Sequence, residues 1–222
     1  MSINKSYSRP DELPATIPVF PLAGALLLPR ADMPLNIFEP RYLAMVDDAL
    51  RGVRLIGMIQ PLPEASENAK TPPLCTVGCL GRITQFAEAG DGRIFIVLTG
   101  VARFRITSEV LAMTQYRQCA VDYEPFVSDL TPRAGEDAVD RKAVLAALRQ
   151  FAKSTNQEVD WKSINQAPNE ALVNSLSAMS PFGSKEKQAL LEASDLKTRA
   201  DVLVAITEME LARGGAEGTS LQ

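Results

Sequence analysis

The chain has 222 residues, of which 46% are hydrophobic and 23% charged, an ordinary globular composition that excludes disorder over most of its length. Its 23 basic and 27 acidic residues give a formal charge of −4, which argues against a general binder of nucleic acid or anionic membranes. The sequence contains no histidine, and this excludes Ser-His-Asp and Cys-His catalysis as well as imidazole metal sites.

Hydropathy along the chain predicts neither a membrane span nor a secretory signal. The longest largely apolar stretch, residues 17–29, contains Pro18, Pro21 and Gly24 and is shorter than the ~20 residues that a spanning helix needs. The first twenty residues lack a basic segment followed by an apolar one. We therefore expect a cytoplasmic protein with no membrane partner.

Short apolar runs separated by proline and glycine follow a polar start at residues 1–14, which we expect to be a loose tail. The runs predict strands at residues 17–20, 25–28, 34–37, 54–60, 76–88, 93–107 and 117–124. The Gly/Asp-rich segment 89–92 lies between two runs and predicts a β-hairpin. Residues 103–106 alternate polar and apolar, which is typical of a strand that has one solvated face and buries Phe104 and Ile106.

One helix is predicted among these strands. Pro40 suits its first position, apolar residues recur at helical spacing up to Leu50, and Gly52 suits the position C′ after its end. Its apolar stripe should cap one end of a small barrel. The segment 61–73 is polar and rich in proline, and we expect it to be a surface loop.

After Pro125 the periodicity becomes helical. The spacing predicts helices at 137–153, 169–179, 184–193 and 195–213, with N-caps at Ser184 and Asp195 and a stop at Gly214 and Gly215. Residues 126–137 should connect the two parts, and residues 214–222 should form a second loose tail. The sequence therefore predicts a β-rich unit at 15–125 and a helical unit at 126–213.

Three segments in the β-rich part carry a family resemblance: Ile17–Leu22 with Met33–Tyr42, then Cys75–Cys79, then Gly100–Ile106. The helical part adds Leu190, Leu191, Glu192 and Arg199. Over about residues 15–213 the chain resembles the N-terminal domain of Lon proteases. The resemblance implies an α+β fold, with an N-terminal PUA-like β pseudo-barrel that has one inserted helix, followed by a C-terminal α-helical bundle.

The same resemblance implies a polypeptide-binding function, because this domain helps full-length Lon to capture substrate proteins. The ATPase and Ser-Lys protease parts of Lon have no counterpart here. The chain has no G-x-x-x-x-G-K-[ST] phosphate loop, nor even a Gly-Lys pair, and it lacks the Ser-Ala-Gly setting of the Lon nucleophile. The chain thus resembles the stand-alone members of the family, and we expect a protein with no enzymatic activity and no cofactor.

Other residue groups that can carry chemistry are better explained by structure. Cys75 and Cys79 are spaced C-x₃-C, but only Cys119 remains as a further thiol, so we expect buried, inert thiols and no metal. The adjacent pairs Asp47–Asp48 and Glu136–Asp137 should be solvated charges. Ser184 and Lys187 could form a Ser-Lys pair, but the first suits an N-cap and the second an exposed helix surface.

The block Phe38–Tyr42 is the most distinctive sequence of the chain and allows two interpretations. As structure, it is a corner between a strand and a helix, in which Tyr42 packs and Arg41 finds an acceptor. As function, it is an anchor for apolar side chains of a partner, and Met33 can serve in the same way. The candidate polypeptide-binding residues are Met33, Phe38, Arg41 and Tyr42.

The expected partner is an unfolded polypeptide or one specific protein, engaged through apolar surface at the junction of barrel and helices. The main alternative is an RNA-binding PUA-like module that uses Arg93, Arg103 and Arg105 along one strand face. Residues 1–125 carry 12 basic and 13 acidic side chains, which argues against that alternative. A hidden small-molecule or enzymatic site is the third hypothesis, and it requires a pocket with convergent polar groups.

Overall fold

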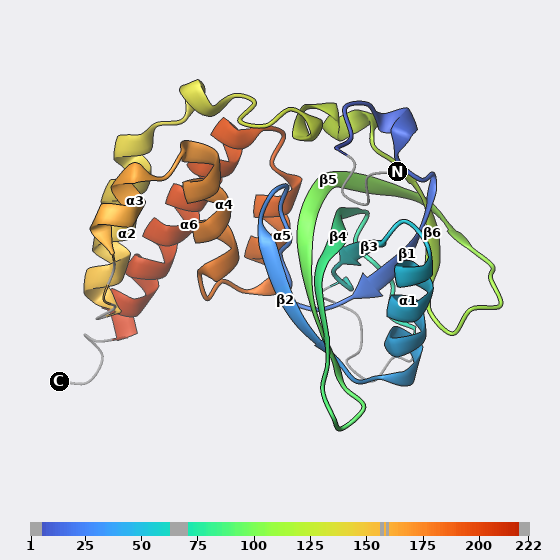
Figure 1. Cartoon of the computed structure of the whole chain (residues 1–222). Coiled ribbons are helices and arrows are strands. Elements are labelled where there is room, and N and C mark those ends of the chain that lie inside the picture. Colours follow the sequence, from blue (N-terminus) through green and yellow to red (C-terminus); the bar gives the residue numbers. More distant parts are fainter. Residues whose placement is uncertain (1–5, 63–70, 156–157, 159, 218–222) are drawn as a thin grey trace.

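Six strands form one sheet within the described residues of this computed structural model, which are 6–62, 71–155, 158 and 160–217. The strands are β1 (Thr16–Pro21), β2 (Asp32–Ile37), β3 (Leu55–Ile59), β4 (Val77–Glu88), β5 (Ile94–Val110) and β6 (Gln118–Asp122). Their order is β2-β5-β4-β3-β1-β6, and β5 also pairs with β6. That last pairing closes five strands into a barrel and leaves β2 as an edge strand, as the family resemblance implied (Figure 1).

The predicted strand at 25–28 is wrong. These residues form a loop in which Leu26, Leu27 and Leu28 are all buried, so the run has no alternation between two faces. Left-handed backbone at Gly24 and Arg30 bends the chain at either end. The loop crosses β5 at Gly100, where a Cβ atom would stand 2.0 Å from the Leu28 carbonyl oxygen.

The predicted helix and hairpin in the β-rich part are confirmed. Helix α1 (Pro40–Arg51) begins with its proline and packs beside the barrel (Figure 1). Gly52 ends it without the left-handed backbone that a glycine at C′ would favour, and Arg54 has the positive φ instead. Strands β4 and β5 pair over most of their length and join at 89–93. Of the predicted loop 61–73, residues 63–70 lie outside the described residues.

The second part of the chain is helical, with several differences from prediction. The helices are α2 (Arg141–Ser154), α3 (Trp161–Gln166), α4 (Asn169–Met179), α5 (Ser184–Glu192) and α6 (Leu196–Glu217). Asp140 caps α2, which therefore starts four residues later than predicted. The short α3 was not predicted, and α6 continues past Gly214 and Gly215. No helix in the described part of the chain is long and apolar enough to cross a membrane.

Two segments predicted to be loose or connecting are packed instead. Of the predicted tail at 1–14, residues 1–5 lie outside the described residues. The rest contains the short 3-10 helix η1 (Pro10–Glu12), Leu13 is buried, and the hydroxyl of Tyr123 donates to the Pro14 carbonyl at 3.0 Å. The segment after β6 contains the 3-10 helices η2 (Glu124–Leu130) and η3 (Glu136–Ala138). Both carry buried side chains toward the barrel and the helices.

The buried apolar side chains form two clusters. One fills the barrel around Phe104 and includes Ile17 and Leu80. The other extends from α1 and the paired strands β2 and β5 to the helices, where it includes Val173 and Leu190. The helical part is thus continuous with the barrel through apolar packing, and Figure 1 shows α5 beside β2 and β5.

Candidate functional site

The four residues proposed from the sequence lie near the junction of β2 and α1, but they do not form one surface. Phe38 follows the last residue of β2 and is 64% exposed. Arg41 is exposed in the first turn of α1, where it pairs with Glu39 at 2.8 Å and lies 4.5 Å from the centre of the Tyr42 ring. Phe38 and Arg41 are therefore accessible to a partner.

Tyr42 and Met33 point toward the core, so little of Tyr42 and only part of Met33 is accessible to a partner. Tyr42 is 6% exposed, its ring centre lies 4.2 Å from that of Phe20, and burial raises its pKa. Met33 is half-buried on the same side of β2 as Leu35 and Ile37, which are buried. Strand alternation and helix register turn these two side chains toward the core.

A second exposed aromatic side chain joins Phe38. In the β2–β5 pairing, Asn36 lies opposite Phe95, and residues in such positions point to the same face of a sheet. Phe38 comes two positions after Asn36, directly after the end of β2, and both aromatic side chains are exposed. We call Phe38 and Phe95 the exposed aromatic pair.

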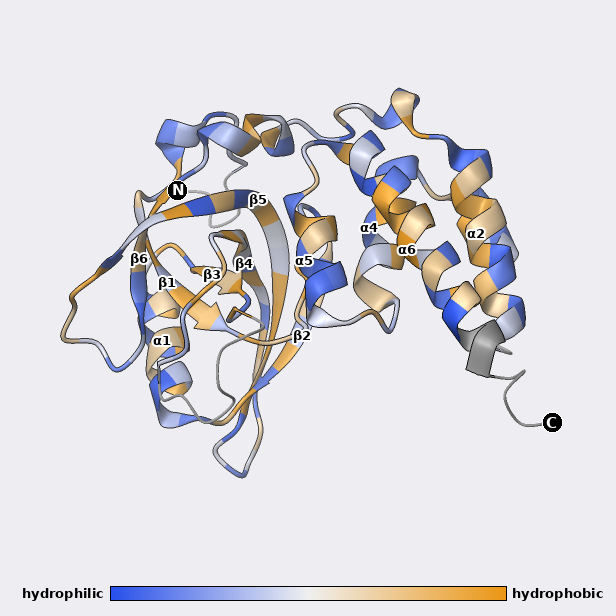
Figure 2. Cartoon of the chain, turned by 180° about the vertical axis from the view of Figure 1, so that it is seen from behind, coloured by the Kyte–Doolittle hydropathy of each residue, from blue (hydrophilic) through white to orange (hydrophobic). Residues whose placement is uncertain are grey.

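The loop between β5 and β6 presents apolar side chains that nothing in the described chain covers. Leu111 and Met113 are 104% and 106% exposed, as much as in an extended peptide. The base of the loop is held by Arg117, whose guanidinium pairs with Glu109 at 2.7 Å. Figure 2 shows this loop projecting from the body of the molecule. We call Leu111 and Met113 the loop tip.

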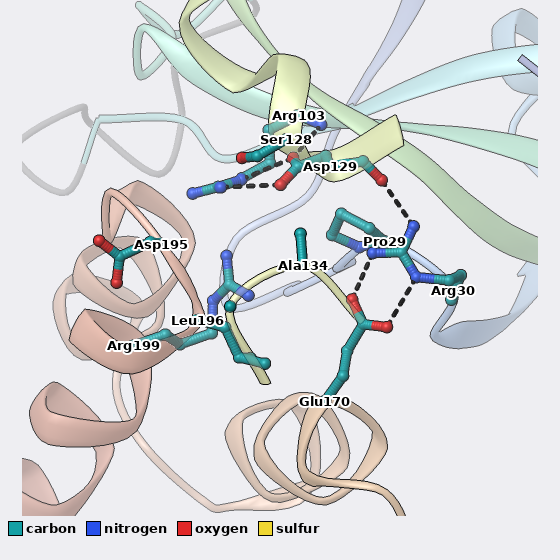
Figure 3. Close-up of a pocket in the computed structure, with 11 residues that line it drawn as sticks. Pro29, Arg30, Arg103, Ser128, Asp129, Ala134, Glu170, Asp195, Leu196 and Arg199 are labelled. Carbon is teal, nitrogen blue, oxygen red and sulfur yellow. Dashed lines mark hydrogen bonds and ion pairs between the residues drawn. The ribbon is translucent and has the colours of Figure 1, made fainter. Parts of the chain in front are cut away.

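A cavity of about 260 Å³ lies where the barrel meets the helices. Its lining residues are Pro29, Arg30, Arg103, Ser128, Asp129, Ala134, Gly135, Glu170, Asp195, Leu196 and Arg199. Figure 3 shows charged side chains from the barrel, η2, α4 and α6 around it. This part of the junction is therefore charged, in contrast to the apolar surface that we expected there.

Arg103 of β5 is the centre of the polar contacts at this junction. The side chain is fully buried, and its Nε and Nη2 each donate to the Asp129 carboxylate at 2.8 Å. Its Nη1 donates to the carbonyls of Leu191 and Ala193, at the end of α5. The predicted solvated position of Arg103 is wrong because η2 and α5 cover that face of the strand.

Arg30 makes a second bidentate pair at the edge of the cavity (Figure 3). Its Nε donates to the Glu170 carboxylate at 2.9 Å, its Nη2 donates to the same group, and its Nη1 donates to the Asp129 carbonyl at 2.6 Å. The backbone N–H of Arg133 donates to Glu170 as well. Arg30 and Arg133 both have positive φ, an uncommon conformation for residues with a side chain.

The structure corrects part of the prediction for adjacent carboxylates. Glu136 is buried, where it accepts from Arg133 and from the backbone N–H of Glu170, so it is not the solvated charge expected. Asp47 and Asp48 are exposed as predicted, and Arg51 pairs with both.

The predicted burial of the thiols is confirmed. All three cysteines are free and buried, and burial raises the pKa of Cys79 and Cys119. Within the described ranges no group of three His, Cys, Asp or Glu side chains is placed to hold a metal ion. Among the same residues no hydrogen bond joins Ser184 to Lys187.

The arginine row proposed for RNA binding is not present on the surface. Arg103 is buried against Asp129, and the charge of Arg93 is paired with Asp91 at 2.5 Å. Only Arg105 of the three remains exposed without such a pair in the described chain.

Sequence patterns did not reveal the acidic partners in the cavity. Asp129 and Glu170 lie 26 and 140 positions from the arginines that they bind. Arg199 occupies a position on α6 that periodicity marked as neither core nor surface. The only sequence signal was the resemblance, which included Arg199, and it assigned no role to that residue.

Comparison with known proteins gives a consistent family match. A model of the ATP-dependent protease La (LON) substrate-binding domain matches residues 16–208. The Lon protease of Flavobacterium johnsoniae is 26% identical over 208 residues, and that of Parabacteroides distasonis is 28% identical over 197 residues. These matches cover 90% and 88% of this chain but 25% and 24% of the relatives, so the chain spans about a quarter of their length.

Two solved structures share the fold. A Lon N-terminal domain protein from Xanthomonas campestris superposes with a TM-score of 0.61 at 23% identity, covering 86% of this chain and 97% of the other. The N-terminal domain of the Mycobacterium avium complex Lon protease has a TM-score of 0.62 at 20% identity, covering 87% and 98%. The α+β architecture expected from the sequence is therefore confirmed.

Proposed function

Because this chain belongs to the family of Lon substrate-binding domains, we propose that it is a non-catalytic module that binds unfolded polypeptide. The match over residues 16–208 supports a Lon-like role in substrate recognition. The same relationship supports a cytoplasmic setting.

The pairing of the charged residues in the cavity supports a non-catalytic role. Arg103 and Arg30 are each held by two hydrogen bonds to one carboxylate, so neither carboxylate is left as a general base. The three thiols are buried, and a raised pKa keeps Cys79 and Cys119 in the unreactive thiol form.

The observation that carries the proposal is the exposure of large apolar side chains at two places near α1. The loop tip is fully exposed, and Phe38 of the exposed aromatic pair is 64% exposed. Exposed apolar side chains of this size are available to an apolar partner, and larger exposed apolar patches mark interaction sites. Extended polypeptide with apolar side chains matches these positions because aromatic side chains and methionine adapt to varied partners.

The test is a fluorescence-anisotropy titration of a labelled, permanently unfolded polypeptide with the purified chain. We expect saturable binding at micromolar concentration, which corresponds to about −8 kcal/mol. The double variants Phe38→Ser/Phe95→Ser and Leu111→Ser/Met113→Ser should each weaken binding by about tenfold or more, the size expected for residues central to an interface.

Met179 provides the matched control because it is 83% exposed but belongs to α4, away from both surfaces. Met179→Ser should bind as the wild type does. The proposal is wrong if the wild type shows no binding to the unfolded polypeptide at concentrations up to millimolar. It is also wrong if Met179→Ser weakens binding as much as the two double variants do.

A further inference from the structure

Three arginines line the cavity, and Arg199 differs from Arg103 and Arg30 because no described carboxylate is hydrogen-bonded to it. The Arg199 side chain is fully buried in α6, where its Nε donates to the Leu190 carbonyl at 3.0 Å and its Nη1 to the Asn174 side chain at 3.1 Å. Its Nη2 is buried and makes no hydrogen bond to any described residue. Figure 3 shows ion pairs for Arg103 and Arg30 and none for Arg199.

The carboxylates near Arg199 are hydrogen-bonded to other arginines. Asp129 is bound by Arg103 and Glu170 by Arg30, each in a bidentate pair. Burial, and after it the charge of Arg103, lower the pKa of Arg199 to about 10, although the charges of Asp129 and Glu170 raise it in part. A buried guanidinium with an unused N–H group is costly, and native proteins rarely retain one without a partner.

The cavity offers room for more than a single bridging water. Its volume is about 260 Å³, whereas one water occupies about 30 Å³ in the liquid. Its edge includes the exposed residues Ser128, Gly135 and Asp195, so the interior is open to solvent.

The start of α6 adds a further positive contribution. Asp195, Leu196 and Arg199 of this first turn line the cavity, and a helix N-terminus carries unpaired N–H groups and the positive end of the helix dipole. The Asp195 side chain satisfies one such group, the Thr198 N–H, at 2.7 Å. A 22-residue helix thus directs its N-terminus toward the same space as the unpartnered guanidinium.

We propose that this cavity binds a small oxyanion, a carboxylate or a phosphate, which accepts a hydrogen bond from Arg199 Nη2 between the barrel and the helices. The ligand supplies the direct hydrogen-bonded partner that Arg199 Nη2 lacks among the described residues. This site is independent of the exposed aromatic pair and the loop tip, so either proposal can fail without the other.

The first experiment is isothermal titration calorimetry of the whole chain with inorganic phosphate and, separately, with acetate, at constant ionic strength set with sodium chloride. We expect saturable heat with at least one of them, and the comparison separates a phosphate site from a carboxylate site. Arg199→Gln should weaken binding about tenfold or more, the usual effect of losing a hydrogen bond to a charged group. Arg105→Gln removes an exposed arginine from β5 outside the cavity and should change nothing.

A second variant keeps the proposal testable if Arg199→Gln does not fold. Asp195→Asn retains an N-cap side chain for α6 but removes a negative charge at the cavity, so anion affinity should rise severalfold. If the cavity holds only water, neither substitution should change the heat measured on titration with phosphate or acetate. Absence of binding by the wild type to both anions, or equal affinity in the wild type, Arg199→Gln and Asp195→Asn, would overturn the proposal.

Discussion

Arg103 shows how one side chain joins the strands to the helices. It belongs to β5, its carboxylate partner belongs to η2, and two of its hydrogen bonds are to carbonyls at the end of α5. Its guanidinium also lies 4.5 Å from the centre of the Phe126 ring. A buried charge of this kind depends on every partner, because removing one leaves the other unpaired in a medium that solvates it poorly.

The buried Arg103–Asp129 pair leads to a prediction for stability. Asp129→Ala should lower the free energy of unfolding by about 3–5 kcal/mol, since it leaves Arg103 as an uncompensated buried charge. Asp129→Asn should cost less, because the amide oxygen still accepts a hydrogen bond. Urea denaturation measures both.

The matched control is the exposed pair Lys197–Asp201, whose atoms lie 2.6 Å apart. Asp201→Ala should cost no more than about 0.5 kcal/mol, as exposed pairs on a helix do. Equal losses for Asp129→Ala and Asp201→Ala would show that burial does not decide the contribution of these pairs.

The cysteines give a second prediction at the residue scale. Cys75, Cys79 and Cys119 are buried, and burial raises the pKa of the latter two, so little thiolate is present near neutral pH. The native chain should react slowly with a thiol reagent such as DTNB, and all three thiols should react at once in guanidinium chloride. Fast reaction of one thiol in the native protein would contradict the described burial.

At the scale of elements, aspartate N-caps define where three of the helices begin. Asp140, Asp160 and Asp195 each accept a hydrogen bond from a backbone N–H two or three residues later. Of the two caps predicted from the sequence, Asp195 is confirmed, whereas Ser184 is the first residue of α5 and Gly183 takes the cap position. The N-cap is the residue whose own backbone is still non-helical just before the first helical residue. A sequence pattern names candidate residue types but does not specify that backbone conformation.

The cap of α6 leads to a prediction that depends on pH. The hydrogen bonds from Thr198 lower the pKa of Asp195, so its ionised form stabilises the folded state. This contribution is present above the pKa of an unfolded aspartate and is lost as the pH falls through the lower folded value. The stability advantage of the wild type over Asp195→Asn, measured by urea midpoints, should therefore shrink from pH 7 to pH 3.

Two alanine variants compare an observed N-cap with a residue that only the sequence marked as one. Asp195→Ala should lower the free energy of unfolding by about 1 kcal/mol at pH 7, whereas Ser184→Ala should leave it nearly unchanged. An unchanged or widening difference between wild type and Asp195→Asn at low pH would contradict the charge-based explanation.

For the whole molecule, the distribution of chromophores allows the two parts to be followed separately. All four tyrosines, at positions 7, 42, 116 and 123, belong to the β-rich part, and the only tryptophan, Trp161, lies in α3. The apolar cluster that extends from α1 to the helices and the Arg103 contacts both join these parts. A joint core of this kind favours a single cooperative unfolding transition.

We therefore predict that tyrosine absorbance and Trp161 fluorescence give the same urea midpoint in the wild type. Asp129→Ala should separate the two midpoints, because it removes a polar connection between the strands and the helices. Separate midpoints already in the wild type would instead support two independently stable units at the predicted boundary near residue 125.

Local patterns in the sequence were sufficient for the types and order of most elements. A short apolar run predicted β1, the Gly/Asp-rich turn predicted the β4–β5 hairpin, and helical spacing predicted α4 with its observed bounds. These features depend on neighbours within a few residues, and this is the range over which periodicity carries information. The family resemblance was likewise carried by short segments whose residues are fixed by local geometry, such as the proline that begins α1.

The tertiary structure alone decided which side chains are accessible and which charges are paired. Tyr42 and Met33 appear suited to binding in sequence but are turned inward, while Phe95 and the loop tip are exposed. Arg103 follows the pattern of a solvated strand residue, yet it is buried because η2 and α5 reach it from distant parts of the chain. Burial and charge pairing depend on contacts between residues far apart in sequence, and for this reason the cavity around Arg199 became visible only in the folded molecule.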